Sequence, residues 1–137
     1  MRILAGFPML ALVIAAYNVM GLGGGMMQSD SQIFDVVMPS GAQVFFNLGD
    51  VFVIAGLAAL FIEIIKAARV ASGTIIDHML STAVFVVALI EFLLVEYCGT
   101  AAFFLLTLMT LIDVVAGFSV SIFSARRDYS VNRDGGL

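Results

Sequence analysis

The sequence is poor in the residues from which soluble enzymes and metalloproteins build their sites. Of its 137 residues none is tryptophan, one is cysteine and one is histidine. A single cysteine, Cys98, excludes an intramolecular disulfide and a cysteine-rich metal site. The lone histidine, His78, cannot form a zinc or haem site without partners. We therefore expect no metal centre and no cofactor, and any interfacial aromatic residues must be Tyr or Phe.

Charged residues are also scarce. They make up 12% of the chain, about half the share typical of soluble domains, whereas hydrophobic residues make up 62%. A soluble domain of this length cannot hide so much apolar surface, because small domains leave much of their chain exposed. Six basic and ten acidic residues argue against a nucleic-acid partner. The composition predicts an integral membrane protein with the lipid bilayer as its surroundings.

Catalytic motifs are missing as well. The chain contains no G-x-S-x-G, no H-E-x-x-H, no P-loop and no G-x-G-x-x-G before a helix. We therefore expect that the protein is not an enzyme.

Four apolar runs are present, and about 20 helical residues suffice to cross a hydrocarbon core of roughly 30 Å. Capping boxes at Ser40–Gln43 and Thr74–Asp77 mark the start of two of the helices. The predicted helices cover residues 3–22, 41–68, 75–97 and 100–124. The first run also fits a secretory signal peptide, but no soluble domain follows it, so we favour a retained helix.

These helices predict an all-α domain over residues 1–126, a four-helix transmembrane bundle with antiparallel neighbours. A polar tail, residues 127–137, follows it. The one longer connection, residues 23–39, contains IFDVVM, which is too short to span and is expected at the interface or against the bundle.

The basic residues predict the orientation. All six fall on the side of the two termini, and none lies in the connections on the other side. The positive-inside rule therefore predicts cytoplasmic N- and C-termini and an extracytoplasmic loop at residues 23–39. From size and topology we expect a bacterial inner membrane.

The last apolar run, residues 100–124, has one acid, Asp113, near its middle. At 100° per residue its polar and small residues share one face. This stripe consists of Thr107, Thr110, Asp113, Gly117, Ser121 and Ser124. We expect the stripe to face other helices, with Ser81 or Thr82 of the third helix beside Asp113.

Two further acids, Asp50 and Glu91, lie inside predicted spans. Helix rise places both in the outer half of the bilayer and Asp113 in the inner half. Two carboxylates at one depth without a nearby base cannot both stay ionised, so a proton or monovalent cation is expected between them. The predicted ion or proton path comprises Asn18, Asn47, Asp50, Glu91, Thr110 and Asp113.

Two functional hypotheses follow. One is a proton- or cation-linked transporter or channel subunit that uses intramembrane carboxylates. The other is a non-catalytic accessory or scaffolding subunit of a larger membrane complex, in which each acid is protonated and hydrogen-bonded to a neighbouring helix. Four helices enclose little volume, so we expect a homo-oligomer or an assembly with other membrane subunits. Glu63 is expected to pair with Lys66.

Overall fold

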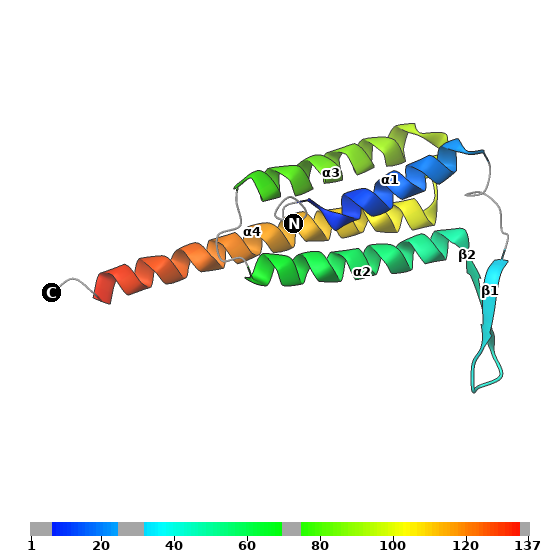
Figure 1. Ribbon diagram of the computed structural model, residues 1–137, viewed down its shortest axis with the longest axis horizontal. Coiled ribbons are helices and arrows are strands. Elements are labelled where there is room, and N and C mark those ends of the chain that lie inside the picture. The colour runs from blue at the N-terminus through cyan, green and yellow to red at the C-terminus, as the bar shows by residue number, and fades with distance from the viewer. Residues whose placement is uncertain (1–6, 25–31, 70–74, 135–137) are drawn as a thin grey trace.

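The computed structural model describes residues 7–24, 32–69 and 75–134, which contain four helices and one β-hairpin (Figure 1). The elements are α1 (Met9–Leu22), β1 (Gln32–Val37), β2 (Gln43–Asn47), α2 (Leu48–Arg69), α3 (Ile75–Leu94), the 3-10 turn η2 (Glu96–Cys98) and α4 (Ala101–Asp134). Three predicted features lie outside the described residues: the helix start at residue 3, the Thr74 cap and the basic Arg2.

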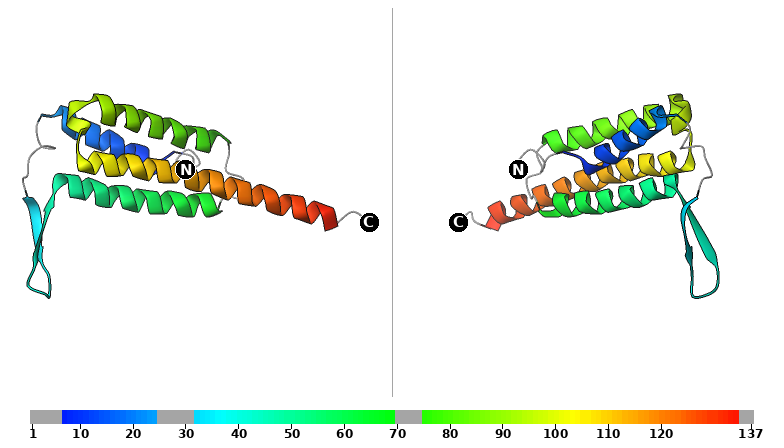
Figure 2. Two further views of the ribbon diagram at one scale, coloured as in Figure 1. Left: turned by 180° about the vertical axis from the view of Figure 1, so that it is seen from behind. Right: turned by 45° about the vertical axis from the view of Figure 1, so that its right-hand side comes forward.

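Three long apolar helices pack together to form the bundle (Figure 2). Segments of 21, 19 and 23 residues in α2, α3 and α4 are long and apolar enough to cross a membrane. Helix α4 packs against both α2 and α3, and α1 packs mainly against α2. Helix α1 has 14 residues, so its described part is about 21 Å long and shorter than a full span. The prediction of a multi-pass helical bundle is confirmed for the three long helices.

The two ends of the bundle differ in what they carry (Figure 1). The hairpin end carries β1, β2, the end of α1 and η2. At the opposite end, which we call the tail end, α4 extends beyond α2 and α3. Residues 127–134, which we predicted as a polar tail, continue α4 as a helix.

The all-α prediction is wrong for residues 32–47. These residues form an antiparallel hairpin in which Val36 pairs with Val44 and Phe34 with Phe46. In its turn Gly41 adopts φ +85°, and its N–H donates to the carbonyl of Met38 at 2.8 Å. Runs of β-branched and aromatic residues flank Pro-Ser-Gly, a pattern that favours a hairpin over a helix start.

The capping box of α2 therefore lies further along the chain than predicted. The Asn47 N–H donates to Asp50 Oδ2 at 2.9 Å, and the Asp50 N–H donates to Asn47 Oδ1 at 3.0 Å. This reciprocal pair satisfies two N–H groups at the helix start. Helix α2 begins at Leu48 rather than at residue 41, so every residue in it lies nearer the hairpin end than expected.

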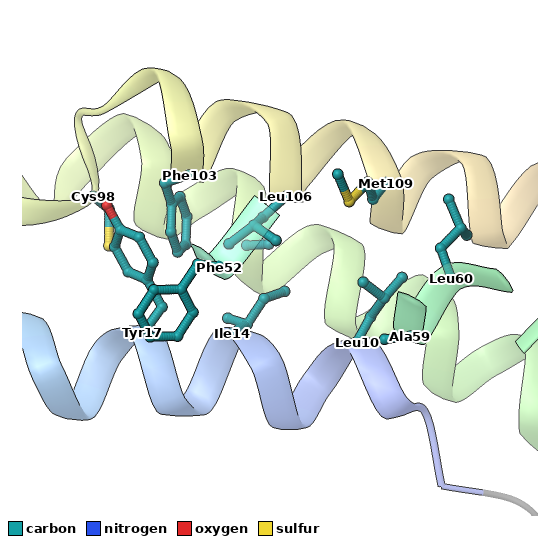
Figure 3. Close-up of a cluster of buried hydrophobic side chains, with 11 residues drawn as sticks. Leu10, Ile14, Tyr17, Phe52, Ala59, Leu60, Cys98, Phe103, Leu106 and Met109 are labelled. Carbon is teal, nitrogen blue, oxygen red and sulfur yellow. The ribbon is translucent and has the colours of Figure 1, made fainter. Parts of the chain in front are cut away.

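An apolar core joins α1, α2 and α4 (Figure 3). The Tyr17 ring packs at centroid distances of 5.2 Å from Phe52 and 4.9 Å from Phe103. Gly56 allows α2 to approach α4 closely, because a Cβ there would lie 2.5 Å from Leu106 Cδ2. The buried apolar residues are Leu10, Ile14, Tyr17, Phe52, Ala59, Leu60, Ala88, Cys98, Phe103, Leu106 and Met109.

Candidate functional site

All four helices contribute to a polar group around Glu63 of α2. The Glu63 side chain is only 6% exposed. Its Oε1 accepts the N–H of Leu10, in the first turn of α1, at 3.4 Å. The first N–H groups of a helix have no intrahelical partners and carry partial positive charge, so a carboxylate is favourable there. Among the described residues Glu63 Oε2 has no hydrogen-bond partner.

A second acid lies beside Glu63. Asp113 of α4 is half-buried, within electrostatic range of Glu63, and lies beside Ser81 of α3. Of the two residues predicted beside Asp113, Ser81 is its neighbour, whereas the Thr82 hydroxyl donates to the carbonyl of His78. Helix rise places Glu63 about 22 Å from the start of α2 and Asp113 about 18 Å from the start of α4. The two carboxylates therefore share one depth in the bundle.

Two basic side chains lie near these acids. Lys66 is within electrostatic range of both carboxylates, and its Nζ donates to the carbonyl of Phe7 at 3.3 Å. Because Glu63 Oε2 has no partner, Lys66 is an electrostatic neighbour of that oxygen rather than its hydrogen-bond donor. His78 shares a 2.5 Å hydrogen bond between its Nε2 and Ser121 Oγ. We call Glu63, Lys66, Ser81 and Asp113 the carboxylate cluster.

The polar stripe of α4 faces the protein interior from Thr107 to Ser121, as predicted. Thr107 and Thr110 are 4% and 1% exposed, and Ser121 contacts His78 of α3. Gly117 leaves room for the same histidine, because a Cβ there would lie 2.8 Å from His78 Nδ1. A stripe of small and hydroxyl residues therefore brings α3 and α4 together beside Asp113.

A second polar group lies at the hairpin end, around Asn18 of α1. Asn18 Nδ2 donates to Glu91 Oε2 at 2.9 Å, which brings together two residues of the predicted path. Asn18 Oδ1 accepts the hydroxyl of Tyr97 at 3.1 Å and the thiol of Cys98 at 3.6 Å. Burial raises the pKa of the Cys98 thiol to about 11, so the thiol is neutral around pH 7.

The remaining residues of the predicted path lie elsewhere. Asn47 and Asp50 bond each other in the cap of α2, whereas Glu91 bonds Asn18. Thr110 is buried, and its hydroxyl donates to the carbonyl of Thr107 at 2.7 Å. The path residues thus fall into separate groups.

Apolar residues separate the two polar groups. Asp113 lies about 18 Å along α4 from Ala101, the first residue of α4 after η2, and Phe103, Leu106 and Met109 of the core lie between them. The Thr107 hydroxyl donates to the carbonyl of Phe103 at 2.9 Å, so it is satisfied within its own helix. Within the described residues of one chain, the polar groups are not joined across this core.

Sequence reasoning missed Glu63 because it placed the start of α2 too early. A start at residue 41 puts Glu63 about 33 Å along the helix, at the membrane surface, where an ion pair with Lys66 is the natural expectation. The hairpin pattern around Gly41 was the signal that places the helix start correctly and moves Glu63 into the bundle.

No group of three or more His, Cys, Asp or Glu side chains in residues 7–24, 32–69 and 75–134 is arranged to hold a metal ion. Three packed apolar helices with polar groups buried between them are the features of a small multi-pass membrane protein. Comparisons with protein-family models, with curated proteins and with solved structures found no match to this chain.

Proposed function

We propose that the protein is a proton- or cation-linked transporter or channel subunit whose binding pair is Glu63 and Asp113. The observation that carries the proposal is the buried Glu63 Oε2, which has no hydrogen-bond partner among the described residues. Buried polar atoms are normally hydrogen-bonded, and an exception needs an explanation such as an exchanging ion or water. Ionisable residues in membrane spans are costly and commonly mark ion pathways.

The charge balance of the carboxylate cluster supports the same proposal. Glu63 and Asp113 carry two negative charges when both are ionised, and Lys66 supplies one positive charge. One negative charge is left over in a low-dielectric setting, where it is unfavourable. A proton or one monovalent cation between the carboxylates removes it. The oxygen atoms of Glu63, Asp113 and Ser81 are ligands that suit a hard cation.

Flux through reconstituted vesicles tests the proposal. A pH-sensitive dye trapped inside the vesicles reports proton entry when a K⁺ diffusion potential is applied, and Na⁺ uptake is measured in parallel. We expect Glu63→Gln and Asp113→Asn each to lower the flux at least about tenfold, because each removes a negative charge that the bound proton or cation neutralises. Glu96→Gln, at an exposed residue of η2, is the matched control and should keep full flux.

The same assay separates Glu63 from the residues first predicted. Asp50→Asn should keep its flux, because Asp50 belongs to the helix cap. Absence of flux from the unmutated protein would contradict the proposal. So would flux through the correctly folded Glu63→Gln and Asp113→Asn variants that equals the flux through the unmutated protein. Size-exclusion profiles in detergent establish that the variants fold.

A second candidate function is a non-catalytic accessory subunit of a larger membrane complex. It is favoured by the apolar core that separates Asn18 and Glu91 from the carboxylate cluster within one chain. In that case the carboxylates serve as interhelical contacts. Extraction from native membranes in mild detergent, with identification of every co-purifying chain, tests it. A stoichiometric foreign partner supports this function, and a particle made of this chain alone contradicts it.

A further inference from the structure

The hairpin of β1 and β2 has two unlike faces. Residues paired across an antiparallel ladder place their side chains on the same face of the sheet. One face therefore carries Phe34 with Phe46 and Val36 with Val44, and all four are apolar. The Phe34 and Phe46 rings stack with their centroids 4.7 Å apart. We call this the Phe34 face.

The opposite face is mixed. It carries the pairs Asp35 with Phe45 and Val37 with Gln43, so an acid and an amide accompany its apolar side chains. We call it the Asp35 face. Asp35 is the one ionisable residue between positions 32 and 47, and this stretch has no Lys or Arg. The hairpin is thus amphipathic, with almost no charge.

The described part of the chain leaves the Phe34 face open. Phe34 is 44% exposed, Val36 43% and Val44 37%; on the Asp35 face Val37 is 62% and Phe45 50% exposed, but there they accompany Asp35 and Gln43. A two-stranded hairpin is at best marginally stable in water, and an exposed apolar face adds to the cost. Something other than the described residues must therefore cover this face when the protein is in its membrane.

The position of the hairpin indicates what covers it. Strand β2 passes directly into α2 at Leu48, where the membrane-spanning segment Leu48–Ala68 begins. The strands run across the bundle axis rather than along it (Figures 1 and 2). When Leu48–Ala68 crosses the bilayer, a hairpin in this direction runs parallel to the membrane surface. Val51 and Ile54, in the first two turns of α2, are also exposed.

We propose that the hairpin is a membrane-surface anchor whose Phe34 face lies in the interfacial layer of the bilayer while the Asp35 face meets water. The occupant of the Phe34 face is lipid. Because the hairpin lacks basic residues, apolar burial rather than attraction to anionic headgroups holds it there. Its depth should be the same in zwitterionic and anionic membranes and at low and high salt. This inference depends on the membrane-spanning bundle and not on ion binding by the carboxylate cluster.

The absence of tryptophan makes a direct test possible, because one substitution supplies the sole tryptophan of the full chain. Phe34→Trp places it on the Phe34 face, and Phe45→Trp is the matched control on the Asp35 face. Each variant is reconstituted in phosphatidylcholine vesicles that contain brominated lipid. We expect the bromine atoms to quench Phe34→Trp about twofold more than Phe45→Trp, and aqueous acrylamide to show the opposite order.

A second reporter protects the test against loss of folding. Phe46→Trp lies on the other strand but on the same face as Phe34, and should behave like Phe34→Trp. If acrylamide strongly quenches both Phe34→Trp and Phe46→Trp while brominated lipid quenches neither, the proposal is overturned. Emission shielded from both quenchers would mean that protein, for example a second copy, covers the face, which also overturns it.

Discussion

Asn18 is a single amide that bonds three other side chains at the hairpin end of the bundle. Its two side-chain atoms engage Glu91 on α3 and both Tyr97 and Cys98 in η2. Residues more than 70 positions apart are thereby joined by hydrogen bonds in an apolar setting. Removal of one member would leave its partners without hydrogen bonds. Such a partly bonded polar group is less stable than an apolar one, because buried polar atoms without partners are costly.

We predict that Asn18→Ala destabilises the folded protein by about 1–3 kcal/mol, because the Glu91 carboxylate loses its donor and the Tyr97 hydroxyl loses its acceptor. Thermal unfolding in detergent measures the change. Ser119→Ala is the control: among the described residues the Ser119 hydroxyl bonds the carbonyl of Val115 in its own helix, and its loss should shift stability by less than about 0.5 kcal/mol. Equal midpoints for Asn18→Ala and the unmutated protein would contradict the prediction.

We predict that the buried Cys98 thiol makes the stability of the folded protein depend on pH. Its thiol pKa is raised from the usual 9.0 to about 11, mainly by burial and secondarily by the Glu91 charge. Because the folded protein holds this proton more tightly than the unfolded chain, the contribution is complete below pH 9 and is lost as pH rises through 11.

The unfolding midpoint of the unmutated protein should therefore fall relative to that of Cys98→Ala as the pH rises through this window. Comparison of the two proteins removes the effect of other groups that titrate there. A difference between their midpoints that stays constant across the window would show that the thiol is not shielded.

Two elements determine where the polar residues lie along the bundle: the hairpin and helix α2. The hairpin occupies residues that we expected to form the first two turns of α2, so α2 starts at Leu48. The consequence is a shift of Asp50 to the surface cap and of Glu63 into the bundle. The contact between α2 and α4 then brings Glu63 beside Asp113.

That helix contact depends on Gly56. A Cβ at this position would lie 2.5 Å from Leu106 Cδ2 and 2.9 Å from Met109 Sδ, both at the ends of flexible side chains. We predict that Gly56→Ala is tolerated with small shifts of these side chains, whereas Gly56→Leu separates the helices and costs about 1–3 kcal/mol.

Unfolding by a titration of denaturing detergent measures the effect of Gly56→Leu. Ala58→Leu is the matched control, because it adds the same side chain to an exposed position of the same helix. If both leucine variants unfold at the same detergent fraction, close approach at Gly56 is not what holds α2 against α4.

At the scale of the whole molecule, the bundle and the end of α4 are separable. Helix α4 extends past the tail ends of α2 and α3 (Figure 1), and its span ends at Phe123. We predict that a chain ending after Arg127 unfolds within about 0.5 kcal/mol of the full-length protein, because the α4 backbone of residues 128–134 lies beyond the ends of α2 and α3. Its thermal midpoint in detergent checks this.

A chain ending after Ala116 serves as the comparison. It lacks Gly117 and Ser121, which contact His78 of α3, and it should be clearly less stable than the full-length protein. A large loss of stability in the longer truncation would show instead that the end of α4 supports the bundle.

Much of the architecture follows from local properties of the chain. Run length and composition predict the three spans, because a helix needs about 20 apolar residues to cross a bilayer. Helical periodicity predicts that Thr107, Thr110 and Asp113 share an inward face, because side chains on one helix repeat every 3.6 residues. Helix rise places Ser81 and Thr82 at the depth of Asp113, and Ser81 is the one beside it. These features need no knowledge of distant contacts.

The carboxylate cluster and the hairpin depended on the tertiary structure. The bond between Leu10 and Glu63 joins residues 53 positions apart, and no local pattern encodes such a contact. The residue at which α2 begins determines whether Glu63 lies at the surface or in the bundle. That start depends on whether residues 41–47 pair in the hairpin or begin a helix. A shift of seven residues along α2 is about 10 Å of depth, enough to exchange the roles of Asp50 and Glu63.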